Sequence, residues 1–187
     1  MGRLMAGVCV AIWSRSLSIL SLVTLTGGLL LASASVQASE GQTGRETGLR
    51  VPRYVSLKSD RVNLRQGPAK EHKTLWVYQR AGLPVEITAE FEMWRRIRDA
   101  DGDEGWVLHS LLSGRRTAII APWAKDAMIE LRGSPSENAT ITARIEPRVV
   151  ATLRRCDQKW CRISGKGFDG FIPQNKLWGV YPDESLN

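Results

Sequence analysis

Apolar residues along most of this chain occur in short runs separated by polar and turn-forming residues. Typical runs are PVEIT (84–88) and VVATL (149–153), which contain β-branched residues and lie in segments punctuated by Gly, Pro, Asp and Asn. No apolar stripe at helical spacing extends over ten residues in these segments. The pattern predicts an all-β fold made of short antiparallel strands and tight turns.

The strand pattern occurs twice. VNLRQGP (62–68) aligns with IELRGSP (129–135), WRRI (94–97) with WCRI (160–163), and GWVLHSLL (105–112) with GFIPQNKL (170–177). The blocks keep their order and are 67, 66 and 65 residues apart. We interpret them as two copies of one module of about 60 residues. The predicted copies span 55–114 and 118–182, with a tail at 183–187.

Each copy is too small to form a large open sheet with protected edges. The Gly/Asp-rich segments DADGDEG (99–105) and SGKGFDG (164–170) predict turns between the last two long strands of each copy. Closing a short sheet on itself removes its exposed edges. The sequence therefore predicts two small β-barrels in tandem.

The N-terminal 38 residues have a different pattern, with an apolar core over 17–31, Arg3 and Arg15 as the only charges, and small residues before Ser39. This is typical of a signal peptide that is cleaved after Ala38 or, alternatively, after Ala34. An uncleaved membrane anchor is the competing interpretation, but the apolar core is shorter than the ~20 residues that span a bilayer. Residues 39–54, rich in Gly, Thr and charge, are predicted to be a flexible linker. An exported protein, periplasmic or extracellular, is therefore expected.

Charge adds little to this picture. The chain has 26 basic and 19 acidic residues, and removal of the signal leaves 24 basic residues. A basic surface is compatible with nucleic acid. Outside the cytoplasm, however, we expect anionic wall polymers as partners rather than nucleic acid, or only a generally soluble surface. A membrane contact is expected only through an uncleaved signal.

The order of motifs resembles the bacterial SH3-type (SH3b) domain. In the first copy the motifs are LRQGP (64–68), GLPV (82–85), WRRI (94–97) and GWV (105–107), and they cover nearly all of 55–113. The second copy matches less closely, and its DGFIPQN segment (169–175) is similar to that of eukaryotic SH3 domains. The resemblance implies a five-stranded barrel that acts as a binding module, often for peptidoglycan or envelope partners.

Two cysteines lie in the second copy, at positions that the repeat relates to a charge pair in the first. Aligning Trp94 with Trp160 gives Cys156 the position of Glu90, and Cys161 the position of Arg95. Within each copy, the two residues are predicted to be cross-strand partners in a hairpin. In an oxidising compartment we expect a disulfide, worth about 2 kcal/mol for so short a loop. A redox pair and half of a metal site are the alternatives.

Residues suited to catalysis are few. The only histidines are His72 and His109, and the repeat places Gln174 at the position of His109. A disulfide would leave no thiolate nucleophile in the second copy. We therefore expect neither an enzyme nor a metal or cofactor site.

Tryptophan and arginine supply the candidate ligand contacts. Through the resemblance, Trp94 and Trp160 correspond to the Trp of the SH3 ligand groove, and Pro173 and Asn175 to further groove residues, with Leu108 and Ser110 at these places in the first copy. Flanking arginines, among them Arg95 and Arg162, would pair with ligand carboxylates, or would only form a solvated strand face. Trp76, Trp123 and Trp178 are predicted to fill barrel ends and the seam between the copies.

These observations favour a non-enzymatic module that binds a cell-envelope ligand, with peptidoglycan or its stem peptides as the best single hypothesis. The alternative is a protein–protein adaptor or scaffold that uses the SH3-like groove or a β edge.

Overall fold

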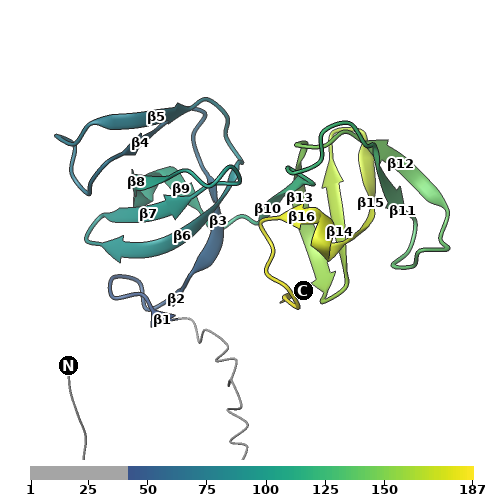
Figure 1. Cartoon of the computed structure of the whole chain (residues 1–187). Helices are drawn as coiled ribbons and strands as arrows, with labels where there is room; N and C mark the ends of the chain where they lie inside the picture. The colour runs from purple at the N-terminus through teal and green to yellow at the C-terminus, as the bar shows by residue number, and fades with distance from the viewer. Residues whose placement is uncertain (1–41) are drawn as a thin grey trace, which may run out of the picture. The chain divides into compact units, whose positions relative to one another are not determined.

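The computed structural model describes residues 42–187 (Figure 1), which belong to one compact unit. The predicted signal peptide, with both of its cleavage sites, lies outside the described residues. Within 42–187 the structure contains no helix long and apolar enough to serve as a membrane span.

Residues 42–51 form a small hairpin rather than a flexible linker. Its strands, β1 (Gln42–Thr43) and β2 (Arg50–Val51), are paired antiparallel. The turn between them is held by Glu90, whose carboxylate accepts the backbone amides of Glu46 and Thr47 at 3.0 and 3.1 Å and the Thr47 hydroxyl at 2.7 Å. The linker prediction is therefore wrong for residues 42–54, because a buried carboxylate of the first copy orders this segment and β3 begins at Arg53.

The first copy is one curled antiparallel sheet with the strand order β5-β4-β8-β7-β6-β3-β9. Its elements are β3 (Arg53–Leu57), β4 (Val62–Arg65), β5 (Thr74–Tyr78), β6 (Pro84–Phe91), β7 (Trp94–Arg98), β8 (Glu104–Leu108), the 3-10 helix η1 (His109–Leu111) and β9 (Leu112–Ser113). Alternate strand residues point inward, and the core contains Leu57, Val62, Leu64, Val85, Ile87, Ile97 and Val107.

The second copy has the same strand order, β12-β11-β15-β14-β13-β10-β16. Its elements are β10 (Thr117–Ile120), β11 (Ile129–Arg132), β12 (Ile141–Ile145), β13 (Val150–Asp157), β14 (Trp160–Gly165), β15 (Phe168–Pro173), the 3-10 helix η2 (Gln174–Lys176), β16 (Leu177–Trp178) and β17 (Ser185–Leu186). The core contains Ile120, Leu131, Ala151, Leu153, Ile163, Ile172 and the two cysteines. The predicted all-β tandem fold is confirmed.

The LR and Gly motifs recur because they perform the same structural task in both copies. A register shift follows Leu64 in β4 and Leu131 in β11. In each copy a glycine faces this point, and a Cβ on Gly105 would lie 2.8 Å from the Arg65 carbonyl oxygen, whereas one on Gly170 would lie 3.1 Å from that of Arg132. The close approach of the two strands therefore favours glycine at both positions, most strongly at Gly105.

Three details differ from the predicted modules. Each sheet contains seven strands along its path rather than five, because a strand at the start of each copy pairs with a two-residue strand near its end. The copies begin at Arg53 and Thr117. The predicted tail forms β17, in which Ser185 and Leu186 pair with Asp157 and Cys156, so the tail is part of the second sheet.

The two matching hairpins have the predicted cross-strand pairs, Glu90 with Arg95 and Cys156 with Cys161. In both hairpins two residues form the turn between the strands. Glu92 in the first turn and Gln158 in the second have φ values of 46° and 78°. The equivalence that the repeat predicted between an ion pair and a disulfide is confirmed.

Side chains near the end of the second copy contact the first. The Tyr181 hydroxyl donates to Glu86 Oε1 at 2.8 Å, and the Trp178 and Tyr54 rings meet edge to face at 5.4 Å. The seam position predicted for Trp178 is therefore confirmed. Trp76 borders the seam, because it lines a groove with Ile119 and Arg148 of the second copy, but it is 58% exposed and does not fill the seam. The prediction is wrong for Trp123, which lies in a turn and is 57% exposed.

Candidate functional site

A groove with a volume of about 600 Å³ lies on the second barrel. Trp160 begins β14 and Pro173 ends β15, and the two residues are directly opposite in the sheet. Asn175 follows in η2. Three of the predicted ligand-binding residues therefore line one groove, which we call the second groove. Its complete lining is Glu137, Gln158, Lys159, Trp160, Pro173, Gln174, Asn175, Leu177, Val180, Pro182 and Asp183.

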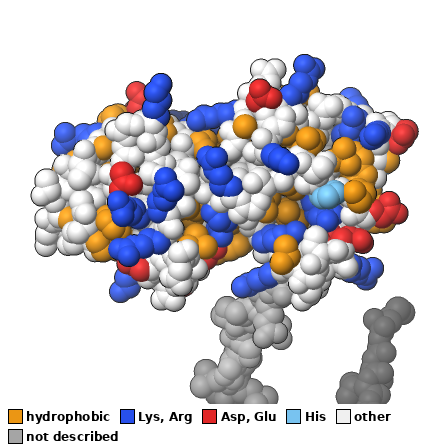
Figure 2. Space-filling model, turned by 180° about the vertical axis from the view of Figure 1, so that it is seen from behind, with side chains coloured by type: hydrophobic (Ala, Val, Ile, Leu, Met, Phe, Trp, Pro, Cys, Tyr) orange, Lys and Arg blue, Asp and Glu red, His pale blue; other side chains and the backbone are white. Residues whose placement is uncertain are grey.

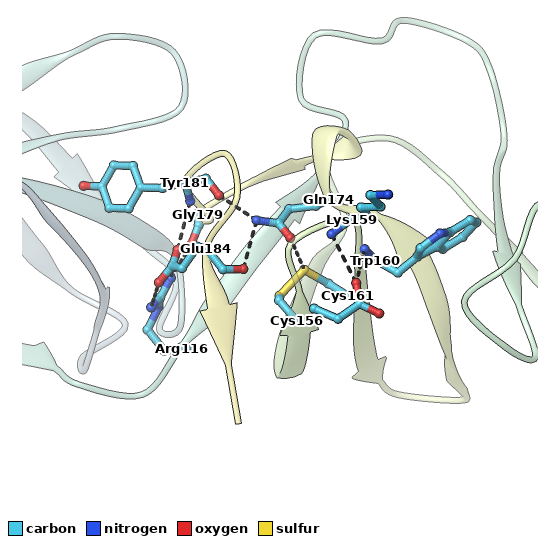
Figure 3. The surroundings of a disulfide bond; sticks show 10 residues. Arg116, Cys156, Lys159, Trp160, Cys161, Gln174, Gly179, Tyr181 and Glu184 are labelled. Carbon is cyan, nitrogen blue, oxygen red and sulfur yellow. Dashed lines mark hydrogen bonds and ion pairs between the residues drawn. A yellow bond between two sulfur atoms is a disulfide. The ribbon is translucent and has the colours of Figure 1, made fainter. Parts of the chain in front are cut away.

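The turn before Trp160 is fixed by Asp157. Its carboxylate accepts the backbone amides of Lys159 and Trp160 at 3.1 and 2.7 Å. These hydrogen bonds, that of Trp160 first, lower the pKa of Asp157. The disulfide between Cys156 and Cys161 closes the same hairpin from the core side (Figure 3). The Trp160 backbone is therefore held from both sides of the turn.

Gln174 fixes the opposite wall of the second groove. Its side chain is buried, and Nε2 donates to the carbonyl oxygens of Tyr181 and Glu184 at 2.6 and 3.2 Å (Figure 3). The Glu184 carboxylate in turn accepts the Tyr181 amide and pairs with Arg116 at 2.6 Å. The segment that supplies Val180, Pro182 and Asp183 to the groove is thus bound to the barrel rather than free.

The charges that line the second groove are not the predicted arginines. Arg162 lies outside the lining, and its Nε pairs with Asp169 Oδ1 at 2.9 Å on the outer strand face. The charged lining residues are Glu137, Asp183 and Lys159. The groove therefore offers an aromatic and proline surface together with both signs of charge, with acids in excess.

The first barrel has a smaller groove, of about 290 Å³, at the equivalent place. We call it the first groove, and it is lined by Arg61, Asn63, Arg65, Lys70, Trp94, Leu108 and Leu111. Trp94 pairs with Leu108 as Trp160 pairs with Pro173. Trp94 lines this groove, where the resemblance placed it, but its ring is only 7% exposed.

Arg95 was predicted to contact ligand, but it is 5% exposed and points inward. Its guanidinium Nη1 donates to the carbonyl oxygens of Glu92 and Trp94, and its Nε lies 3.6 Å from Glu90 Oε1. Arg95 occupies the place that the cysteine has in the second copy, and like the cysteine it stabilises the hairpin. A ligand in either groove would not reach it.

Neither the first nor the second groove is lined by a histidine. His72 lies against the backbone of Gly67, where a Cβ would come within 2.4 Å of its Nε2, and His109 begins η1. Within residues 42–187 no group of three His, Cys, Asp or Glu side chains has an arrangement suited to a metal ion.

Sequence reasoning missed several groove residues. Glu137 could have been found, because the repeat aligns it with Lys70 of the first groove. Val180, Pro182 and Asp183 lie after the last repeated block, so no internal comparison could indicate them.

The comparison with family models agrees with the fold. The family model described as bacterial SH3 domain matches residues 58–114 and again 125–179. No curated protein matches the chain significantly. Among solved structures, NlpC2 from Trichomonas vaginalis is similar at 14% identity and a TM-score of 0.31, over 68% of this chain and 48% of that one. NlpC1 from the same organism is similar at 13% identity and a TM-score of 0.31, over 72% and 48%.

The chain spans about half the length of these two structures. The two family matches cover more than half of the chain and fall on the two barrels. The chain therefore belongs to the bacterial SH3 domain family.

Proposed function

We propose that this protein is an exported, non-enzymatic binding module of the cell envelope and that its second groove binds the stem peptides of peptidoglycan. The observation that carries the proposal is the convergence of Trp160, Pro173 and Asn175 in one groove of about 600 Å³. Bacterial SH3 domains are often cell-wall binding modules, which supports the choice of ligand.

The lining suits a short peptide better than a glycan alone. Trp160 and Pro173 offer an apolar surface on which peptide side chains can stack. Glu137 and Asp183 suit a ligand amino group, and Lys159 suits a carboxylate. Stem peptides carry both of these groups next to small apolar residues. Because the disulfide and Gln174 fix the walls of the groove, the protein loses little conformational entropy when a ligand binds.

Co-sedimentation with peptidoglycan stripped of protein tests this function. The purified protein is pelleted at ~0.15 M salt and at higher salt, since screening separates diffuse charge attraction from a specific groove. We expect pelleting that resists salt and is lost in Trp160→Ala. The matched control is Trp123→Ala, which removes an exposed tryptophan outside both grooves. Release of all protein by salt, or equal pelleting of the two variants, would contradict the proposal.

A protein–protein adaptor is the second candidate, and one observation favours it. Strand β5 lies at the edge of the first sheet and exposes Leu75 and Trp76, at 48% and 58%. Exposed apolar edge strands are sites of β augmentation. An adaptor would pellet only with envelopes that still contain protein, and the loss would follow Trp76→Ala rather than Trp160→Ala.

A further inference from the structure

The first groove combines three basic side chains with an apolar floor. Arg61, Arg65 and Lys70 line it together with Trp94, Leu108 and Leu111. Its lining contains no acidic residue. None of the ion pairs within residues 42–187 includes any of the three basic side chains. On the face shown in Figure 2, both basic and acidic side chains are present. The groove therefore combines an apolar floor with three positive charges that have no ion-pair partner among the described residues.

The repeat shows that this charge belongs to the first copy alone. At the positions of Arg61, Asn63 and Lys70 the second copy has Met128, Glu130 and Glu137. Arg65 corresponds to Arg132, which pairs with Glu130 at 2.9 Å. Two barrels with the same strand order therefore carry grooves of opposite charge, which argues that the two grooves take different chemical groups.

One of the basic side chains, Arg65, is held in place by the loop that carries Lys70. Arg65 Nη1 donates to the carbonyl oxygens of Lys70 and His72 at 2.8 and 2.9 Å, which closes the loop after β4. The Gln66 amide donates to the Lys73 carbonyl oxygen across the same loop. The backbone of Lys70 is thus fixed at the rim of the groove before a ligand arrives, which reduces the entropy lost on binding.

We propose that the first groove is a separate site for a peptide carboxylate, namely the C-terminal carboxylate of a peptide that ends in a small apolar residue. Arg61, Arg65 and Lys70 pair with the carboxylate, and Trp94, Leu108 and Leu111 cover the adjacent apolar group. A phosphate polymer would meet the charge but would leave the apolar floor without a partner. The volume of about 290 Å³ limits the site to the end of a chain.

This inference goes beyond the proposed function, which rests on the second groove. The test is a two-dimensional NMR titration of the purified protein with N-acetyl-alanyl-alanine, with its C-terminal amide, and with inorganic phosphate. The acid and the amide differ only in the charged group. We expect the acid to shift the backbone amide signals of Trp94 and Leu108, and the amide and phosphate to leave them unchanged at equal concentration.

Variants that import residues of the second copy localise the effect. Lys70→Glu and Arg61→Met change exposed side chains and leave Arg65 to close its loop. We expect each to weaken binding of the acid about tenfold, since each removes a hydrogen-bonded charge. Arg80→Glu alters an exposed charge of the same barrel outside this groove and is expected to bind normally.

Three outcomes would overturn the inference. Equal binding of the acid and the amide would remove the role of charge, and equal shifts with phosphate would make the site a general anion site. Shifts confined to Trp160 and its neighbours would assign the carboxylate to the second groove. That last result would overturn the inference and still leave the proposed function standing.

Discussion

The buried carboxylate of Glu90 yields the most quantitative prediction. Besides the Thr47 hydroxyl and two backbone amides, it accepts the Arg53 guanidinium at 2.7 Å, and its side chain is 1% exposed. Glu90→Gln keeps the size of the side chain and removes its charge. It leaves Arg53 and Arg95 without a negatively charged partner. It also weakens the hydrogen bonds that the hairpin at residues 42–51 donates to this side chain.

The size of the effect follows from the pKa of Glu90. Burial alone would raise the pKa, but hydrogen bonds from Thr47, Arg53 and the backbone amides outweigh it and lower the pKa from 4.5 to about 2. This difference corresponds to about 3 kcal/mol in the free energy of unfolding. The folded-state value is the lower one, so the stabilisation is complete above pH 4.5 and is lost as the pH falls toward 2.

Urea unfolding followed by tryptophan fluorescence measures the free energy at pH 7 and near pH 3. We expect Glu90→Gln to lose about 3 kcal/mol at pH 7, and the difference from the parent to shrink to about half near pH 3. Hydrogen exchange measures the effect locally: in Glu90→Gln the backbone amides of Glu46 and Thr47 should lose their protection from exchange. The matched control is Glu104→Gln, whose half-exposed ion pair with Arg96 is worth less than about 1 kcal/mol.

A loss in the free energy of unfolding at pH 7 that is no larger for Glu90→Gln than for Glu104→Gln would refute the stabilising role of Glu90. A loss that is the same at pH 7 and near pH 3 would also refute it, because the stabilisation would then not arise from the ionised carboxylate.

Two further predictions concern the structural frame of the barrels. Replacing Cys156 and Cys161 together by Ser should lower the free energy of unfolding of the second barrel by about 2 kcal/mol, measured by urea unfolding; an unchanged midpoint would contradict the stabilising role of the disulfide. Gly105→Ala should cost about 1–3 kcal/mol, because its Cβ would meet the Arg65 carbonyl oxygen, whereas Gly114→Ala has open space and should be neutral. Equal melting temperatures of the two Ala variants would refute the close approach.

The barrels and their register could be predicted because they depend on local and repeated signals. Short apolar runs between turn-forming residues indicated the strands, and the repeat with its hairpin predicted the cross-strand pairs Glu90 with Arg95 and Cys156 with Cys161. A cross-strand pair can be predicted by counting residues along the two strands from the turn, whatever side chains occupy the pair. Prediction of this kind extends to any feature that the two copies share.

Features outside the repeat escaped prediction. The hairpin at residues 42–51 consists mostly of polar residues and Gly, and its order comes from Glu90, more than 40 residues away. Arg95 was predicted to lie at the surface because arginines are seldom fully buried, but here it occupies the position of a core cysteine and donates to backbone carbonyl oxygens. Trp94 and Trp160 share a register and differ in exposure, because the walls around them come from unlike residues.

Binding of peptidoglycan peptides in the second groove can be followed by an NMR titration of the purified protein with soluble peptidoglycan fragments. We expect saturable shifts of the Trp160 indole signal and of the Asn175 backbone amide in the parent protein, and no shift of the Asn175 amide in Trp160→Ala. Fragments that leave these signals unmoved at saturating concentration, or that shift only residues of strand β5, would contradict it.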